Sequence, residues 1–269
     1  MIYSRRKNNP GFTLVEVLTT VVIFSIALTV LAMALTSSKN ILNETTSSSD
    51  AAQSLRKLYI NLETDLHCTS FQESETNPSL VGSGAGLTGD AIWFLSAVDP
   101  ATGQVARASN GTPLWQRNVL YYTAVPTNHA ALYGFNCAGG ANADGYDVHC
   151  PHKVLIRKVI DFGTPTTPTN EASQELLIPA GSIAAYLTPP TGFNVPLTNP
   201  GEEEGQVLIS QLLTFRAQRG PGALPTEIHI EAKCTSLKEL GKKTAVGSTN
   251  LENAPETESI EFSIFPQNP

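Results

Sequence analysis

An uninterrupted apolar segment near the start of the chain restricts the fold more than any other feature. Residues 12–36 read FTLVEVLTTVVIFSIALTVLAMALT, and Glu16 is the one charged residue between Lys7 and Lys39. As a helix, this segment would span about 37 Å, which exceeds the ~30 Å hydrocarbon core of a membrane. Three positive charges precede it, at Arg5, Arg6 and Lys7. The pattern predicts a transmembrane helix over 12–36 with its N-terminus in the cytoplasm and the rest of the chain outside.

Three interpretations of this segment compete. A plain membrane anchor is the simplest. A secretory signal peptide is the second, since Ala32-Met33-Ala34 supplies an A-x-A cleavage pattern, although the apolar region is longer than a usual signal core. Glu16 fits neither of these, because a carboxylate in apolar surroundings is costly without a partner.

The third interpretation rests on the residues around Glu16. Residues 11–16, GFTLVE, resemble the processing motif of type IV prepilins and type II secretion pseudopilins. The resemblance implies that a prepilin peptidase removes the leader 1–11, cutting between Gly11 and Phe12, and that Phe12 is then N-methylated. Glu16 would be the fifth mature residue and would pair with the N-terminal amine of a neighbouring subunit. Such a pair neutralises two charges that neither lipid nor a filament core can solvate.

The remaining chain predicts an α+β protein, with a long N-terminal helix packed on a strand-rich, largely antiparallel domain. No proline or glycine occurs between Gly11 and Pro78, and apolar residues recur at helical spacing up to Leu66. We therefore expect a helix over 12–67 and an extracytoplasmic domain over 68–269. Candidate strands are Ala91–Val98, Val119–Val125, Val154–Ile160, Val207–Phe215, Glu227–Ala232 and Ile260–Phe265.

Two further segments carry structural expectations. Residues 163–206 hold many prolines, threonines and glycines with few strand signals, which predicts a long surface excursion. The run Glu202-Glu203-Glu204 at its end predicts a solvated acidic patch.

The body carries a second resemblance. The segments Leu55-Arg56…Asp65-Leu66, Leu155-Ile156-Arg157, LISQLLTFRAQ (208–218) and LPTEIHIEA (224–232) look like the J-type minor pseudopilin of type II secretion and the W-type minor pilin. The resemblance implies a strand-rich body with two sheets against the end of the long helix.

Four cysteines in an exported chain favour disulfides. The short loop between Cys137 and Cys150 favours that bond, which leaves Cys68 with Cys234, although three pairings are open. A metal site at Cys137, His149, Cys150 and His152 is the alternative, but its spacing matches no common zinc pattern. Within the same loop, Asn142, Asp144 and Asp147 form an oxygen-rich cluster that fits a solvated turn or a calcium site.

Composition narrows the function classes. The net charge is −7 and no basic run follows Lys7, which argues against nucleic acid as the main partner. No catalytic motif stands out, so we expect no enzyme activity and no cofactor. The function predicted is a minor pilin- or pseudopilin-like subunit that helps start or cap a filament, with other pilin subunits, the prepilin peptidase and the inner membrane as partners. The alternative is an exported binding or adhesion module on a pilin-type anchor, for which the 163–206 excursion leaves room.

Overall fold

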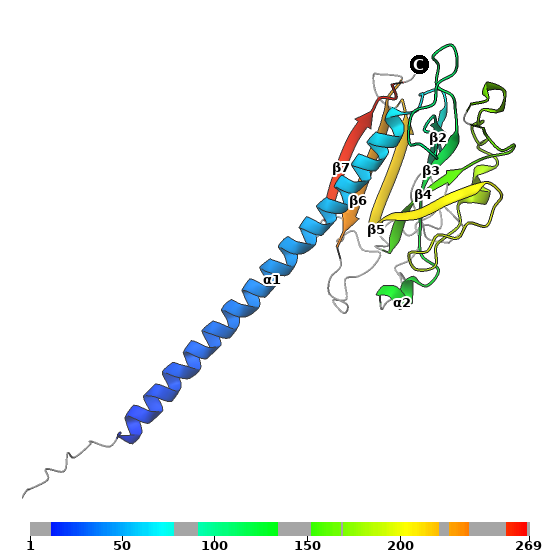
Figure 1. Cartoon of the computed structure of the whole chain (residues 1–269). Helices are drawn as coiled ribbons and strands as arrows, with labels where there is room; N and C mark the ends of the chain where they lie inside the picture. The colour runs from blue at the N-terminus through cyan, green and yellow to red at the C-terminus, as the bar shows by residue number, and fades with distance from the viewer. Residues whose placement is uncertain are drawn as a thin grey trace, which may run out of the picture. The chain divides into compact units, whose positions relative to one another are not determined.

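The computed structural model describes residues 12–77, 91–133, 152–167, 169–220, 226–236 and 257–267. The chain forms two compact units, residues 1–45 and 46–269. One helix, α1 (Leu14–His67), contributes residues to both units. The second unit contains the sheet, a short helix α2 (His129–Tyr133) and two 3-10 turns, Glu171–Ser173 and Ile183–Tyr186 (Figure 1).

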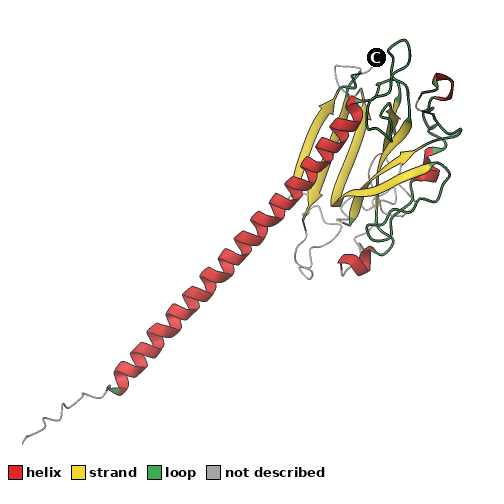
Figure 2. Cartoon of the chain, in the orientation of Figure 1, coloured by secondary structure: helices red, strands yellow, loops and turns green. Residues whose placement is uncertain are grey.

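The described strands form one seven-stranded sheet in which each strand is antiparallel to the next along the chain. Figure 2 shows these strands together beside the C-terminal part of α1. The α+β class, with a long helix on an antiparallel sheet, is therefore confirmed. The strands are β1 (Ser74–Asn77), β2 (Ala91–Ser96), β3 (Arg117–Ala124), β4 (Lys153–Ile160), β5 (Glu202–Arg219), β6 (Ile228–Thr235) and β7 (Thr257–Ile264).

The C-terminal part of α1 packs on the inner face of the sheet through one apolar stripe. Leu55, Leu58, Leu62 and Leu66 are at most 3% exposed, and their spacing of three or four residues places them on one side of the helix. They join a core with side chains from β2 to β7. Each such leucine contributes about 1.5–3 kcal/mol by burial, so this stripe fixes the second part of α1 to the sheet.

Strand β5 is bent and belongs to two parts of the sheet. Its first half pairs with β4, and its second half, from Leu212 onward, pairs with β6. Gln211, at the junction, has a positive φ of 60° and register shifts flank it. Such irregularities increase twist and bend a strand. Arg219, near the end of β5, reaches Glu75 of β1 at 3.2 Å, so the sheet curls until its first strand meets its fifth.

The excursion over 163–206 lies mostly at the surface, as predicted, but it also forms a second structural layer, because several of its side chains are buried against the sheet. It covers the outer face of β2, β3 and β4, and Trp93 of β2 donates a hydrogen bond to the carbonyl of Ile178 at 2.8 Å. Hydrophobic periodicity did not predict these buried residues, because they lie among prolines in irregular segments and do not recur at helix or strand spacing. The buried hydrophobic side chains of this layer are Ile178, Ile183, Tyr186, Leu187 and Val195.

The three consecutive glutamates are ion-paired, and the prediction of a solvated acidic patch is wrong for Glu202, whose side chain is fully buried, whereas Glu203 and Glu204 are exposed. A register shift leaves Glu203 without a partner residue in β4, so Glu202 and Glu204 turn to opposite faces of the sheet. Glu202 binds Lys158 at 2.6 Å with both side chains fully buried. Glu204 lies 3.3 Å from Arg157. Glu203 accepts two hydrogen bonds from Arg117, at 2.6 and 2.9 Å.

A buried carboxylate, Glu175, holds the outer layer to the sheet. It accepts hydrogen bonds from Asn118 of β3 at 2.6 Å, from the backbone N–H of Phe162 at 2.9 Å and from the Thr166 hydroxyl at 2.9 Å. Burial, with a smaller contribution from the neighbouring Asp161, raises the pKa of Glu175 to about 7, although the hydrogen bonds from Phe162 and Thr166 act in the opposite direction. The folded protein therefore binds a proton here more readily than the unfolded chain does.

This shift predicts a loss of stability with rising pH. Because the folded pKa is raised, the contribution of Glu175 is complete below the unfolded value of about 4.5 and disappears as the pH rises through about 7. At about 1.4 kcal/mol per pKa unit, Glu175 contributes up to about 3 kcal/mol to the free energy of unfolding at low pH. Glu175→Gln should flatten the dependence of the unfolding midpoint on pH between 5 and 8. Glu44→Gln, at an exposed position of α1, is the control, and equal slopes in both variants would contradict the assignment.

Candidate processing and assembly site

Helix α1 begins in a capping box built from Thr13 and Glu16. The Glu16 carboxylate accepts hydrogen bonds from the backbone N–H and from the hydroxyl of Thr13, both at 2.9 Å. The Thr13 hydroxyl oxygen in turn accepts the N–H of Glu16 at 3.3 Å. Two of the four N–H groups that a helix start leaves without partners are thus satisfied. Glu16 is therefore placed within one turn of Phe12, the residue that cleavage after Gly11 would make the new N-terminus.

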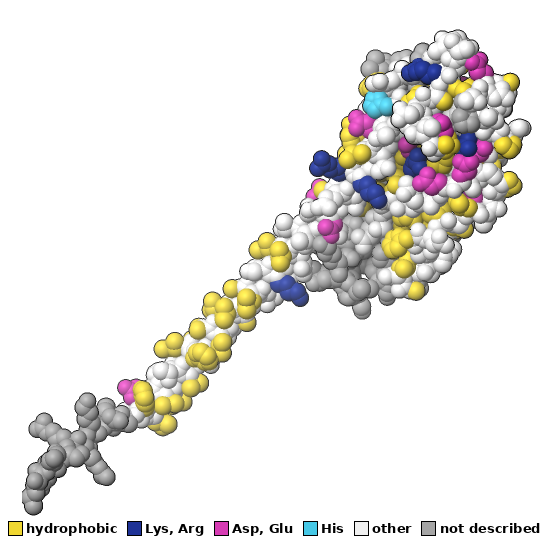
Figure 3. Space-filling view, viewed as in Figure 1, with side chains coloured by type: hydrophobic (Ala, Val, Ile, Leu, Met, Phe, Trp, Pro, Cys, Tyr) yellow, Lys and Arg dark blue, Asp and Glu magenta, His cyan; other side chains and the backbone are white. Residues whose placement is uncertain are grey.

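The first part of α1 exposes nearly all of its apolar side chains. Phe12 is 86% exposed and Phe24 is 65% exposed, and Figure 3 shows hydrophobic side chains over much of the visible helix surface. Among the described residues, this helix has the one segment long and apolar enough to cross a membrane. A soluble protein rarely exposes so large an apolar surface, so this part of α1 needs lipid or other chains around it.

A polar network fixes the end of α1 to the sheet. Asp65 accepts a hydrogen bond from Arg157 of β4 at 2.7 Å and another from the hydroxyl of Tyr121 of β3 at 2.6 Å. Arg157 also reaches Glu204. The sequence pattern singled out Asp65 and Arg157 separately, but their contact and the role of Tyr121 were missed because the three residues lie far apart in sequence.

Cys68 and Cys234 are both free thiols, so the predicted bond between them is contradicted. Cys234 lies beside Ser54, which precedes Cys68 by 14 positions. That separation is about 21 Å along a helix, whereas bonded cysteines need Cα atoms within about 7 Å. Burial raises the pKa of Cys234 to about 12, so its thiol stays protonated and is a poor nucleophile.

Non-reducing peptide mapping of the full chain tests the cysteine assignment. We expect a linked Cys137–Cys150 peptide. When the chain is unfolded without a reductant and alkylated, the peptides with Cys68 and Cys234 should both be recovered unlinked and alkylated. A linked Cys68–Cys234 peptide would contradict the structure. Four free thiols would rule out the loop disulfide.

Several predicted residues lie outside the described residues. Gly11, Cys137, Cys150 and the cluster over 142–147 are among them. Within the described ranges, no three His, Cys, Asp or Glu side chains lie close enough together to hold a metal ion.

The comparisons with known proteins bear on the N-terminal segment. The family described as "Prokaryotic N-terminal methylation motif" matches residues 6–32, which include Gly11, Phe12 and Glu16. Searches of curated proteins and of solved structures returned no significant match. The matched segment therefore includes the predicted cleavage junction, the capping box and most of the exposed apolar helix. Together these features show that the N-terminal segment of the chain carries a methylation motif of the kind found in type IV prepilin-like proteins.

Proposed function

We propose that this chain is a minor pilin- or pseudopilin-like structural subunit that helps start or cap an envelope filament. The observation that supports this most directly is the exposed apolar helix that follows the methylation motif, with Glu16 as its single charge before Lys39. In a filament, that helix packs against the equivalent helices of other subunits, and the polar body makes contacts at the filament surface.

The leader and the helix would act in the steps before assembly, which are membrane insertion, cleavage and methylation. The helix first anchors the chain in the inner membrane with its N-terminus in the cytoplasm and its body outside, as the basic residues before it favour. A prepilin peptidase cuts between Gly11 and Phe12 and methylates Phe12. Assembly into the filament then moves α1 from lipid to protein surroundings.

The Glu16 carboxylate would favour assembly, a role that it could not have in a plain membrane anchor. In the single chain it occupies the capping box with Thr13. After cleavage, the amine of Phe12 carries a positive charge next to Thr13, and a neighbouring subunit brings a second such amine. A carboxylate in an apolar environment is stabilised by that cation, so Glu16 favours the assembled state over the isolated one.

The body supports the minor-subunit assignment through the residues that carry its resemblance. Leu55 and Leu66 are in the core under α1, and Asp65 binds Arg157. These residues thus form the joint between the helix and the sheet, which a structural subunit needs to transmit force from helix to body.

The alternative is an adhesion module on a pilin-type anchor, presented by the 163–206 excursion, which is held on the sheet by a few buried side chains and is otherwise mostly exposed. What favours it is a set of exposed apolar side chains on that layer: Leu176, Phe193 and Leu197.

Isolation of the inner-membrane complex or filament that contains the full chain separates the two functions. The subunit proposal predicts co-purification with other small proteins that carry the same N-terminal motif, at a fixed ratio. Recovery of the chain alone, with binding to an external ligand, would favour the adhesion module instead.

A further inference from the structure

Strand β5 has one edge that is only partly paired with the other described strands. Its first half pairs with β4 along one edge, and β6 joins the other edge from Leu212 onward. Within the described ranges of the chain, no strand pairs with this second edge between Val207 and Ser210. An open edge presents backbone N–H and C=O groups that can pair with another extended chain.

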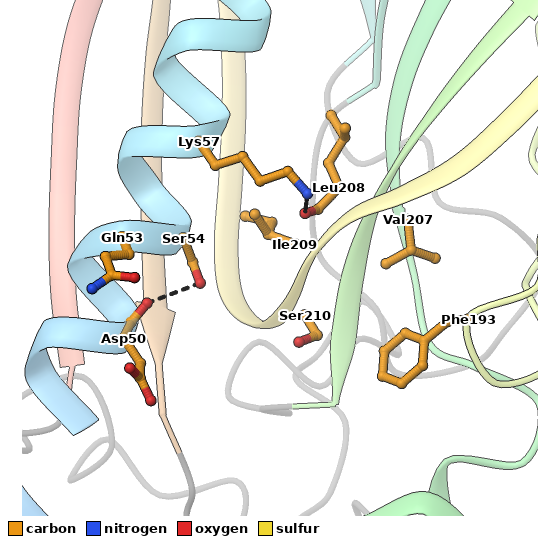
Figure 4. Close-up of a pocket in the computed structure, with 9 residues that line it drawn as sticks. All are labelled: Asp50, Gln53, Ser54, Lys57, Phe193, Val207, Leu208, Ile209 and Ser210. Carbon is orange, nitrogen blue, oxygen red and sulfur yellow. Dashed lines mark hydrogen bonds between the residues drawn. The ribbon is translucent and has the colours of Figure 1, made fainter. Parts of the chain in front are cut away.

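A cavity of about 470 Å³ lies where the next strand would run. Residues of α1 form one wall, Phe193 of the outer layer forms another, and β5 lies at the back (Figure 4). This volume falls within the range of ligand sites in proteins. A segment placed here would lie between α1 and the outer layer, as β3 and β4 do. The lining residues are Asp50, Gln53, Ser54, Lys57, Phe193, Val207, Leu208, Ile209 and Ser210.

Lys57 shows that the open edge has hydrogen-bonding capacity. Its ammonium donates a hydrogen bond to the carbonyl of Leu208 at 2.8 Å (Figure 4). The register shift in β4 leaves Leu208 without a paired residue, so its carbonyl turns toward α1. A backbone N–H from an added strand would share this carbonyl with Lys57 or displace the ammonium from it.

The two walls of the groove differ in polarity, and this difference indicates which pattern of side chains a bound segment would need. The α1 wall is polar, with Gln53, Ser54 and Lys57, whereas the opposite wall is apolar, with Phe193 and Val207. Phe193 is 56% exposed. Side chains of a strand alternate between two sides, so a segment that alternates apolar and polar residues matches both walls and covers Phe193.

We propose that this groove accepts an extended amphipathic segment of a neighbouring filament subunit, which adds to β5 as an extra strand. The proposal rests on the proposed function. The polar wall belongs to α1, the helix through which assembly proceeds, so a neighbour packed along α1 brings its own chain beside the groove. Strand addition would give the contact direction and register, which exposed apolar helices alone specify poorly.

Site-specific photo-cross-linking in the full chain tests this in native membranes with the filament system expressed. A photoreactive residue at Phe193 should cross-link to an alternating apolar–polar peptide of a co-assembled prepilin-like subunit, identified by mass spectrometry. A probe at Arg216, which is exposed on β5 away from the groove, should not. A probe at Leu31 in the apolar helix should cross-link to partner subunits whenever the chain assembles, whether or not the groove is occupied.

Two variants sharpen the result. Gln53→Trp fills the groove from an exposed position and should abolish the Phe193 cross-link while the Leu31 cross-link remains. Arg56→Trp is the matched control, since Arg56 is exposed on the same helix but does not line the groove, and should leave both cross-links intact.

Each other outcome overturns the inference. Cross-links from Leu31 without any from Phe193 would reject the groove and leave the proposed function standing. Cross-links from Phe193 only to residues 237–256 of the same chain would mean that the chain fills its own groove. Absence of cross-links from both probes would reject the groove and the proposed function together.

Discussion

Glu16→Gln is expected to leave membrane insertion and cleavage nearly normal and to reduce recruitment into the filament complex about tenfold or more. The amide retains the shape of the side chain and can still take part in a capping box, so α1 begins as before. It lacks the charge that would meet the amine of a neighbouring Phe12. A loss of only ~1.4 kcal/mol of pairing energy changes recruitment about tenfold, and a desolvated ion pair can contribute more than that. Glu16→Ala should behave similarly.

Thr13→Ala is the matched control for Glu16, because it removes the capping partner and keeps the carboxylate. Loss of a cap costs about 1 kcal/mol of helix stability but leaves the charge in place, so recruitment should remain close to normal. Cross-linking to partner subunits in membranes measures the effect. Full recruitment of both Glu16 variants would mean that Glu16 acts as a cap at most and that the body alone directs assembly.

Glu202→Ala should produce the largest loss of stability, about 3–5 kcal/mol. The Glu202 carboxylate and the Lys158 ammonium are 2.6 Å apart with no solvent exposure of either side chain. Burial lowers the pKa of Lys158 even with Glu202 beside it, so the buried ammonium depends on that carboxylate. Lys158 also holds the carbonyl of Tyr186 at 3.0 Å, and its disturbance would loosen the outer layer from β4.

Glu204→Ala is a close control for this effect, because Glu204 lies two residues away in the same strand. Its side chain is 54% exposed and it lies 3.3 Å from Arg157, so its removal should cost less than about 1 kcal/mol. Thermal unfolding of the full chain in detergent should therefore show a midpoint lowered on the order of 10 °C for Glu202→Ala and little change for Glu204→Ala. Similar midpoints for the two variants would contradict the buried pair.

The sequence predicted the parts of the fold whose signal is local. The leucine spacing along α1 and the apolar runs of β2 to β4 are visible without partners, because burial on one face imposes its period on the residues themselves. The GFTLVE segment likewise carries its own signal, and residues 6–32 match the methylation motif.

What the sequence did not reveal depends on distant partners. Glu202 looks solvated until Lys158, 44 positions earlier in the chain, is placed beside it. Cys68, which follows the end of α1, and Cys234 on β6 are free thiols. Their separation depends on where these elements lie in the fold, which the spacing of cysteines in the sequence does not give. The groove beside Val207 lies where β5 bends at Gln211, next to two register shifts. These irregularities leave no periodic pattern in the amino-acid sequence.

The N-terminal peptide of the mature chain, recovered from membranes and analysed by mass spectrometry, tests the central claim most directly. The account predicts a peptide that begins with N-methylated Phe12, because the junction after Gly11 lies within the matched methylation motif. A peptide that begins after Ala34 would show an ordinary signal peptide, and an intact start at Met1 would show a plain anchor. Either result would contradict the assignment of this chain as a processed filament subunit.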